Sequence, residues 1–296
     1  MTYIDLLQHN PVLYLSLIFI FGLLVGSFLN VIIYRLPVML KRQWKTDCMS
    51  FLAQENEPVP GSTTSNDQPF NLIVPRSRCP HCGHLITALE NVPVLSFLFL
   101  GGRCRECKTP ISVRYPLIEI LSASLAVLVA WKYGFSYQAA MGIVLSWALI
   151  SLSVIDYDHQ YLPDNITLPF LWLGLFLNLN NLYVDLASAV LGAIMGYLVL
   201  WLVYQVFKIV TGKEGMGYGD FKLLAMLGAW LGWQSLPAII LISTLVGSII
   251  GVSLIVFKQH NRNHPIPFGP YLAIAGWIVL LWGNEINNAY LNWINF

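Results

Sequence analysis

Long apolar segments follow one another along most of the chain, with short polar stretches between them. A helix needs about 20 predominantly apolar residues to cross a bilayer, and most of these segments approach that length. The segment at 220–233 is shorter, and is either a half-span or one broken unit with the segment after it. The pattern predicts an all-α polytopic membrane protein with about eight transmembrane helices. The segments lie at about 12–34, 114–131, 138–155, 166–184, 186–207, 220–233, 237–257 and 268–284.

One long interruption separates the first apolar segment from the second. It is rich in polar and charged residues and carries all five cysteines. We therefore expect a first transmembrane helix within 1–34, an extramembrane domain at 35–113 and a seven-helix membrane domain at 114–296. The tract from Glu55 to Asp67 is rich in Gly, Ser, Thr, Asn and Pro, which predicts an exposed loop.

The first apolar segment is expected to be a permanent span. No basic region precedes it and no small-residue cleavage site follows it, so it does not match a cleavable signal peptide. Small and polar side chains occur in its second half, among them Gly22, Gly26 and Asn30. Such residues let helix backbones approach closely in a membrane. We expect this side to contact another helix.

Composition strengthens the membrane interpretation. The chain is 56% hydrophobic and only 10% charged, with a mean hydropathy of +0.64. These values exclude an ordinary soluble protein of 296 residues. We expect the lipid bilayer as a partner and no nucleic acid.

The extramembrane domain contains two C-x2-C knuckles with 21 residues between them. This spacing is close to that of a tetrahedral four-cysteine zinc site, although two disulfides are the competing interpretation. Four thiolates would fill the coordination sphere, so the zinc would be structural. His81 and His84 are alternative ligands within the same stretch. The predicted ligands are Cys79, Cys82, Cys104 and Cys107.

The basic residues predict the orientation of the spans. If the cysteine domain is cytosolic, the connections near 157–165, 208–219 and 258–267 are cytosolic too, and both termini are periplasmic. Of the 16 Lys and Arg residues only Lys132 then lies outside, as the positive-inside rule favours. A reducing cytosol in turn favours zinc over disulfides.

Acidic residues at the ends of two predicted spans suggest chemistry. Three alternating glycines lead into Asp220 at the start of one span, and Asp156 closes another. On the predicted topology both lie at the cytosolic side, at the same membrane depth. Two adjacent carboxylates share a proton, so one can activate a water while the other donates to a substrate carbonyl. The residues themselves leave the partner of Asp220 open among Asp156, Asp158 and Asp164.

Each of these acids also has a structural interpretation. Asp220 is placed to be a helix N-cap or a first-turn acid, and Asp164 to be an N-cap. Lys222 is a candidate ion-pair partner for Asp220, or extends to the lipid headgroups. Glu119 lies within the second span, where Arg114 on the same helix is its expected ion-pair partner.

The chain resembles the type IV prepilin leader peptidases, bacterial inner-membrane aspartic peptidases that also N-methylate the mature pilin. The Gly-x-Gly-Asp element alone is less specific, because presenilin-like peptidases share it. The matching blocks are spread over most of the chain and together are highly specific. They are Gly26 to Pro37, the two cysteine knuckles, Tyr115 to Glu119, Asp156 to Asp164, Gly215 to Leu224 and Pro267 to Tyr271.

The resemblance implies that Asp156 and Asp220 are the catalytic pair. It implies substrates as well: type IV prepilins and type II secretion pseudopilins, whose short basic leader is cut on the cytosolic side after Gly and before Phe. It further implies methylation of the new amino terminus by S-adenosylmethionine. The chain has no Rossmann glycine fingerprint, so the binding residues for this cofactor are unassigned, and the cytosolic domain is the place to seek them.

Two other classes of protein compete with this interpretation. A proton- or cation-coupled secondary transporter would also use membrane carboxylates, but near the bilayer centre and commonly with inverted repeats, which are not evident here. A zinc protease within the membrane would need an open metal site, and the sequence has no H-E-x-x-H.

Overall fold

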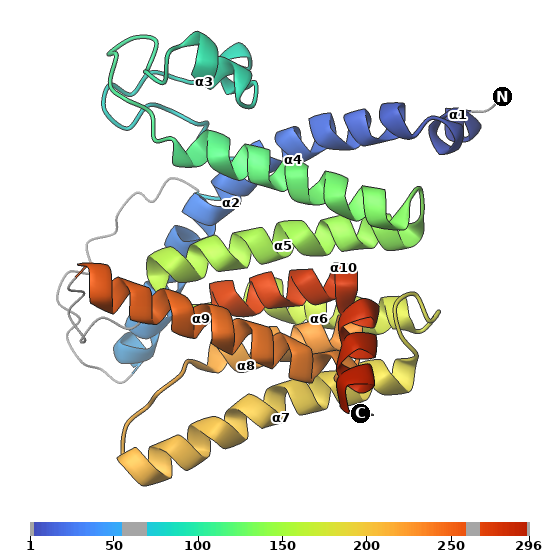
Figure 1. Ribbon diagram of the computed structural model, residues 1–296. Helices are drawn as coiled ribbons and strands as arrows, with labels where there is room; N and C mark the ends of the chain where they lie inside the picture. Colours follow the sequence, from blue (N-terminus) through green and yellow to red (C-terminus); the bar gives the residue numbers. More distant parts are fainter. Residues whose placement is uncertain (1–2, 55–69, 259–266, 295–296) are drawn as a thin grey trace. The chain divides into compact units, whose positions relative to one another are not determined.

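The structure is a computed structural model that describes residues 3–54, 70–258 and 267–294 (Figure 1). These residues are mostly helical and contain no strand, only two isolated β-bridges. The chain divides into two compact units, one of Ser16–Ser124 and one of Met1–Leu15 with Leu125–Phe296. The exposed loop predicted from Glu55 to Asp67 lies outside the described residues.

A helix lies in each of the eight predicted apolar segments, although the helix in 166–184 ends at Asn178, six residues before its predicted end. Within the described residues, five helical stretches are long and apolar enough to cross a membrane: Pro11–Leu52, Arg114–Tyr133, Tyr137–His159, Leu186–Thr211 and Trp233–Ser253. Eight crossing helices therefore stay a prediction. The long helices are α2 (Pro11–Gln54), α4 (Arg114–Tyr133), α5 (Tyr137–His159), α6 (Asp164–Asn178), α7 (Leu186–Thr211), α8 (Tyr218–Leu231), α9 (Leu236–Lys258) and α10 (Gly269–Ile294).

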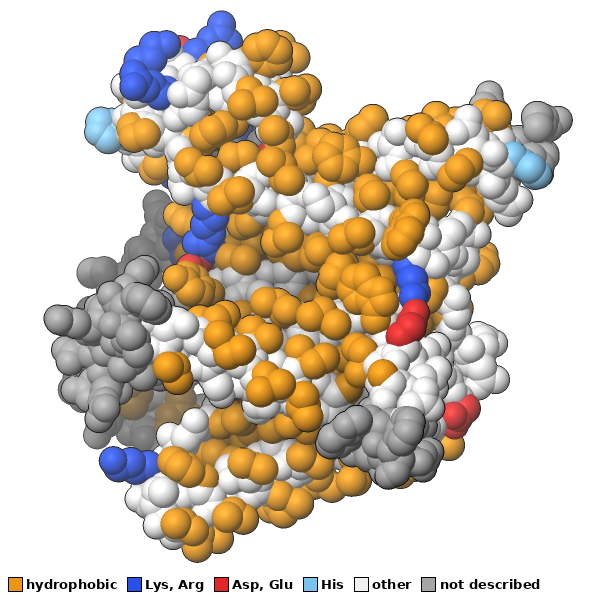
Figure 2. Space-filling model, viewed as in Figure 1, with side chains coloured by type: hydrophobic (Ala, Val, Ile, Leu, Met, Phe, Trp, Pro, Cys, Tyr) orange, Lys and Arg blue, Asp and Glu red, His pale blue; other side chains and the backbone are white. Residues whose placement is uncertain are grey.

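Much of the surface of these helices is apolar. Figure 2 shows hydrophobic side chains over most of the visible face, as expected for helices in contact with lipid. Shorter elements complete the described fold: α1 (Tyr3–His9), α3 (Leu95–Phe99) and two 3-10 turns, Leu89–Asn91 and Trp233–Ser235.

Helix α2 is longer than the sequence predicts. Its apolar part ends near residue 34, yet the helix continues to Gln54 with Pro37 inside it. Arg35 is buried and its guanidinium donates to the carbonyl oxygens of Asn71 and Pro75, at 2.9 and 2.6 Å. These two carbonyl oxygens satisfy the guanidinium in place of water. The helix can therefore continue past its first charged residue.

Helices α2 and α4 pack within the Ser16–Ser124 unit, as the small residues of the first span predict. Gly22 lies directly against Ala123 of α4. The Asn30 side chain donates to the carbonyl oxygen of Tyr115 at 3.2 Å. The predicted contact face of the first span is therefore confirmed.

Helix α8 is the core of the other unit. Eleven of its 14 residues are buried, and it packs against α6, α7 and α10. Gly196 brings α7 close, because a Cβ there would lie 2.7 Å from the carbonyl oxygen of Leu224. From α6, Asn178 donates to the carbonyl oxygen of Ala229 at 2.9 Å. These contacts fix α8 and the aspartate at its start.

A break separates α8 from α9. The sequence places it between Gln234 and Pro237, and the structure places it slightly earlier, at Gly232. Gly232 has a φ of +79°, which only glycine adopts readily, and the turn at Trp233–Ser235 follows.

Candidate active site and metal centre

Asp156 lies in the last turn of α5 and is 5% exposed. Its Oδ2 accepts a hydrogen bond of 3.0 Å from the backbone N–H of Gly269, the first residue of α10. The first N–H groups of a helix have no partner within the helix and favour an anion. A Cβ at position 269 would lie 2.6 Å from Oδ2, so this approach requires glycine.

Asp220 is the third residue of α8, and its side chain and backbone are 8% exposed. The N-cap of this helix is Gly217, so the interpretation of Asp220 as the N-cap residue is wrong and the first-turn interpretation is confirmed. The backbone N–H of Asp220 donates to the carbonyl oxygen of Gly217 at 3.2 Å, which closes the first turn of the helix.

The two aspartates come together through the connection that follows α5. The Leu162 side chain lies against both Gly219, next to Asp220, and Gly269, which binds Asp156. Helix α10 packs against both α5 and α8. The structure thus gathers two buried aspartates around Leu162: Asp156 accepts the first N–H of α10, and Asp220 lies in the first turn of α8.

The other acids near this site are placed differently. Asp158 is exposed in the last turn of α5. Asp164 begins α6 after the N-cap Pro163, so its predicted N-cap role is wrong. The two carboxylate oxygens of Asp164 lie 2.8 and 2.7 Å from Nζ of Lys222. Lys222 therefore pairs with Asp164 and not with Asp220.

The four knuckle cysteines form one cluster, with all their sulfur atoms within 4.8 Å of one another. Sγ of Cys79 lies 3.8 Å from that of Cys107, and Sγ of Cys82 lies 3.9 Å from that of Cys104. A tetrahedral ion with metal–sulfur bonds of about 2.3 Å requires sulfur separations of about 3.8 Å, whereas a disulfide requires about 2.0 Å. The arrangement fits a metal ion held by four thiolates.

The two knuckles have the same backbone turn. In each, the N–H of the residue after the second cysteine donates to the carbonyl oxygen of the first, from Gly83 to Cys79 and from Lys108 to Cys104, both at 3.0 Å. Both donors have positive φ, +75° at Gly83 and +58° at Lys108. The repeated turn aims both pairs of thiols at one point.

Glu90 links the two knuckles beside the cluster. Its carboxylate accepts the Thr87 N–H at 2.9 Å and lies 3.2 Å from Nε2 of His84 and 3.7 Å from Nη1 of Arg105. The hydrogen bonds from Thr87, together with His84, lower the pKa of Glu90 to about 2. His84 therefore contacts Glu90 and is not a member of the cluster, which consists of the four cysteines.

Glu119 connects several elements of the Ser16–Ser124 unit. It is buried in α4 and accepts the backbone N–H of Val94, the N-cap of α3, at 2.7 Å. Gly26 of α2 packs directly against the backbone of Glu119. These contacts explain a buried carboxylate structurally, and its pairing with Arg114 stays a prediction.

Comparison with known proteins identifies the family. The model of the bacterial Peptidase A24 N-terminal domain matches residues 20–133, and that of the type IV leader peptidase family matches residues 143–252. A prepilin leader peptidase/N-methyltransferase of Aeromonas hydrophila is 54% identical over 97% of both chains. Those of Pseudomonas aeruginosa and Legionella pneumophila are 51% and 45% identical, over 100% and 93% of both chains. The chain belongs to the type IV leader peptidase family. No solved structure matches it.

Two contacts in this leader peptidase family member were not predicted from its sequence. One feature of the sequence indicates the role of Gly269 as the donor to Asp156. A Gly-Pro pair stands at the start of an apolar segment, where helix N-termini are common. Glu90 had none, because its partners come from both knuckles and meet only in the folded domain.

Proposed function

We propose that this chain is an aspartic prepilin leader peptidase and N-methyltransferase in which Asp156 and Asp220 carry out the cleavage. The observation that carries the catalytic assignment is the placement of these two buried aspartates around Leu162, with Asp156 against the first N–H of α10 and Asp220 in the first turn of α8. The activity itself is the one named for relatives that are 45–55% identical over nearly the whole chain.

The arrangement suits general acid–base hydrolysis. Two carboxylates buried together retain one proton between them, because a second negative charge there would be poorly solvated. The ionised aspartate takes a proton from a water as that water attacks the scissile carbonyl carbon, and the protonated aspartate donates to the carbonyl oxygen. Collapse of the tetrahedral intermediate breaks the C–N bond, and a proton passes from the dyad to the leaving amine.

The proposed substrates are type IV prepilins and type II secretion pseudopilins, cut after Gly and before Phe. In such a substrate a basic leader precedes an apolar helix. Asp156 lies in the last turn of α5 and Asp220 in the first turn of α8, so the dyad is at helix ends. A bond between a leader in the cytosol and a helix in the bilayer would lie at the same depth.

The position of the dyad also argues against the alternative of a proton- or cation-coupled transporter. Transporters bind their ions near the bilayer midplane, where helices are interrupted. Here Asp156 is in the last turn of α5, and the break between α8 and α9 lies at Gly232, at the opposite end of α8 from Asp220.

We further propose that the cysteine cluster binds one structural Zn²⁺. Cys79, Cys82, Cys104 and Cys107 would supply all four ligands, which leaves no position for a catalytic water. The ion would hold the two knuckles together and contribute to folding of this domain. We assign it no part in peptide hydrolysis.

The N-methyltransferase activity is proposed from the name of the relatives. The family resemblance implies S-adenosylmethionine as the methyl donor, and we assign no residues to it. We place the protein in the bacterial inner membrane, with the cysteine domain in the cytosol and both termini in the periplasm.

The catalytic assignment is tested by replacing each aspartate with its amide. Asp156→Asn or Asp220→Asn should abolish prepilin cleavage in detergent, because neither amide can replace a carboxylate that takes up and donates protons. Cleavage is measured by the mobility shift of a purified prepilin, and folding by thermal unfolding.

The neighbouring acids provide the controls. Asp158→Asn and Asp164→Asn should retain cleavage, since Asp158 is exposed and Asp164 pairs with Lys222. Retained cleavage in Asp156→Asn or Asp220→Asn would refute the dyad, and complete loss in a folded Asp158→Asn variant would mean that the wrong member of the pair was assigned.

A further inference from the structure

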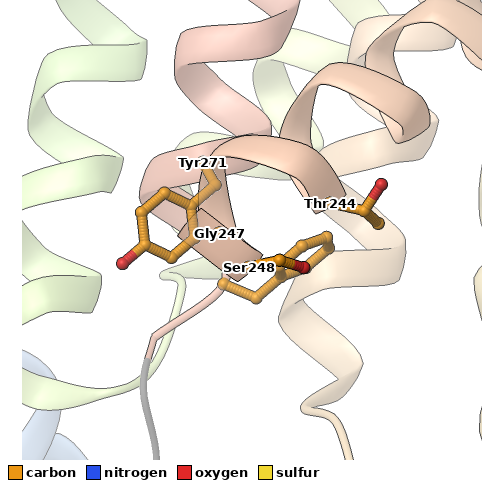
Figure 3. Close-up of a pocket in the computed structure, with 5 residues that line it drawn as sticks. Thr244, Gly247, Ser248 and Tyr271 are labelled. Atoms are coloured by element: carbon orange, nitrogen blue, oxygen red, sulfur yellow. The ribbon is translucent and has the colours of Figure 1, made fainter. Parts of the chain in front are cut away.

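A pocket of about 250 Å³ lies between α9 and α10. Three residues of α9, one of α10 and Phe268, which directly precedes α10, line it. Figure 3 shows Tyr271 on one side and Thr244 and Ser248 on the other. The five lining residues are Thr244, Gly247, Ser248, Phe268 and Tyr271.

One residue of the pocket wall is adjacent in the chain to the residue that contacts Asp156. Phe268, in its wall, and Gly269 share one peptide group, and the N–H of that group donates to Oδ2 of Asp156 at 3.0 Å. Phe268 therefore places the wall of the pocket next to the residue that holds the Asp156 carboxylate.

The chemistry of the lining favours an apolar, flat ligand. None of the five residues is charged, and two carry aromatic rings. The Thr244 hydroxyl donates to the carbonyl oxygen of Ile240 in its own helix, at 2.7 Å. Gly247 lies against the Tyr271 ring, and a Cβ at 247 would be 3.1 Å from Cδ2 of that ring. Aromatic side chains favour a ring as a neighbour, edge-on or offset.

We propose that this pocket binds the side chain of the first substrate residue after the scissile bond, an aromatic ring in the substrates proposed above. This inference rests on the proposed peptidase function. The nitrogen of that residue is bonded to the reacting carbonyl carbon. Its side chain must therefore lie close to the two aspartates during cleavage. The pocket meets this requirement, because its wall is one peptide group from the contact to Asp156.

Filling the pocket tests the proposal. In Ser248→Trp a large ring occupies the space. The kcat/KM for a substrate with Phe after the scissile bond should therefore fall more than the kcat/KM for one with Ala at that position. We measure kcat/KM for both prepilins with the purified full-length enzyme. The Phe-to-Ala ratio should fall about tenfold, the discrimination that an apolar pocket typically provides.

A matched control comes from the adjacent residue. Ile249 is an exposed residue of α9 that does not line the pocket, so Ile249→Trp adds a similar ring and should leave the ratio unchanged. Thr244→Phe fills the pocket from a position one turn away on α9 and should lower the ratio as Ser248→Trp does. It keeps the test decisive if Ser248→Trp is poorly folded.

An unchanged Phe-to-Ala ratio of kcat/KM in folded Ser248→Trp and Thr244→Phe would overturn the proposal. The same holds if both substrates lose activity equally, as expected for a pocket that holds a lipid chain. Failure of the wild-type enzyme to cut either prepilin would instead refute the proposed function. The two failures are therefore distinguishable.

Discussion

Because Gly269 has no Cβ, the backbone of α10 can approach Asp156 of the proposed dyad closely. Without a Cβ, the first N–H of α10 reaches Oδ2 of Asp156 at 3.0 Å. Gly269 also touches Leu162, which lies against Gly219 beside Asp220. One small residue thus orients one aspartate and permits the approach of the element that carries the other.

Gly269→Ala should therefore reduce peptide cleavage with little effect on folding. The new methyl group would lie 2.6 Å from Oδ2 of Asp156 and would displace the carboxylate. A displacement of about 1 Å in a catalytic group can cost about 100-fold in rate. Measurement of kcat on a prepilin checks this expectation.

Gly283→Ala is its matched control, in the part of α10 that follows the kink at Trp282. There the added methyl group meets only the Val279 side chain, at 3.2 Å, and cleavage should remain close to wild type. Equal activity in Gly269→Ala and Gly283→Ala would show that the Gly269 contact does not position Asp156.

Sequence reasoning from the residues alone did not choose the partner of Asp220, and the reason is geometric. Asp156, Asp158 and Asp164 lie within nine positions at the same end of neighbouring helices. Only packing separates them, by burying Asp156 and leaving Asp158 and Asp164 exposed. The error at Lys222 has a related origin, because residues two apart on a helix do not face each other. Lys222 instead reaches Asp164 on α6.

Among the elements, the cysteine knuckles were the most predictable from sequence. Each turn is local, so the C-x2-C spacing already determines which two thiols lie together. The cluster in the structure agrees with that spacing. The contacts of Glu90 were not predictable, because they depend on how the two knuckles meet.

A double substitution of Cys79 and Cys82 to Ser should remove the metal and destabilise the cysteine domain. Structural zinc in small modules contributes about 10–16 kcal/mol of apparent binding energy, so loss of two ligands should lower the temperature of thermal unfolding strongly. Elemental analysis of purified wild-type protein should find about one zinc per chain, and the variant none.

Cys48→Ser is the control, since Cys48 is exposed in α2 and outside the cluster. It should retain the full metal content. Wild-type protein without metal, or metal lost in Cys48→Ser alone, would refute the site. Chelation should lower stability before it lowers cleavage, because we assign the ion no contact with the substrate.

At the scale of the whole molecule, the apolar pattern located the long helices but not their environment. Helix α8 is apolar on nearly all sides, which suits either lipid or a protein core. The structure buries 11 of its 14 residues within the protein. Hydropathy describes the side chains of a segment and not what surrounds them. The sequence therefore indicated a short apolar helix at α8 but not that this helix forms the core of its unit. The continuation of α2 beyond residue 34 was missed for a similar reason, since carbonyl oxygens distant in sequence solvate Arg35.

The orientation of the chain in the membrane leads to a prediction that thiol labelling can check. With the cysteine domain in the cytosol, Tyr137 at the start of α5 lies at the periplasmic side and Lys213 after α7 at the cytosolic side. Both residues are exposed. In a Cys48→Ser background, a membrane-impermeant maleimide should label Tyr137→Cys in intact spheroplasts, whereas Lys213→Cys should react only after permeabilisation. The reverse labelling pattern would place the proposed dyad in the periplasm, away from a cytosolic leader. Labelling of both cysteine variants before permeabilisation would contradict an odd number of membrane crossings between the two positions.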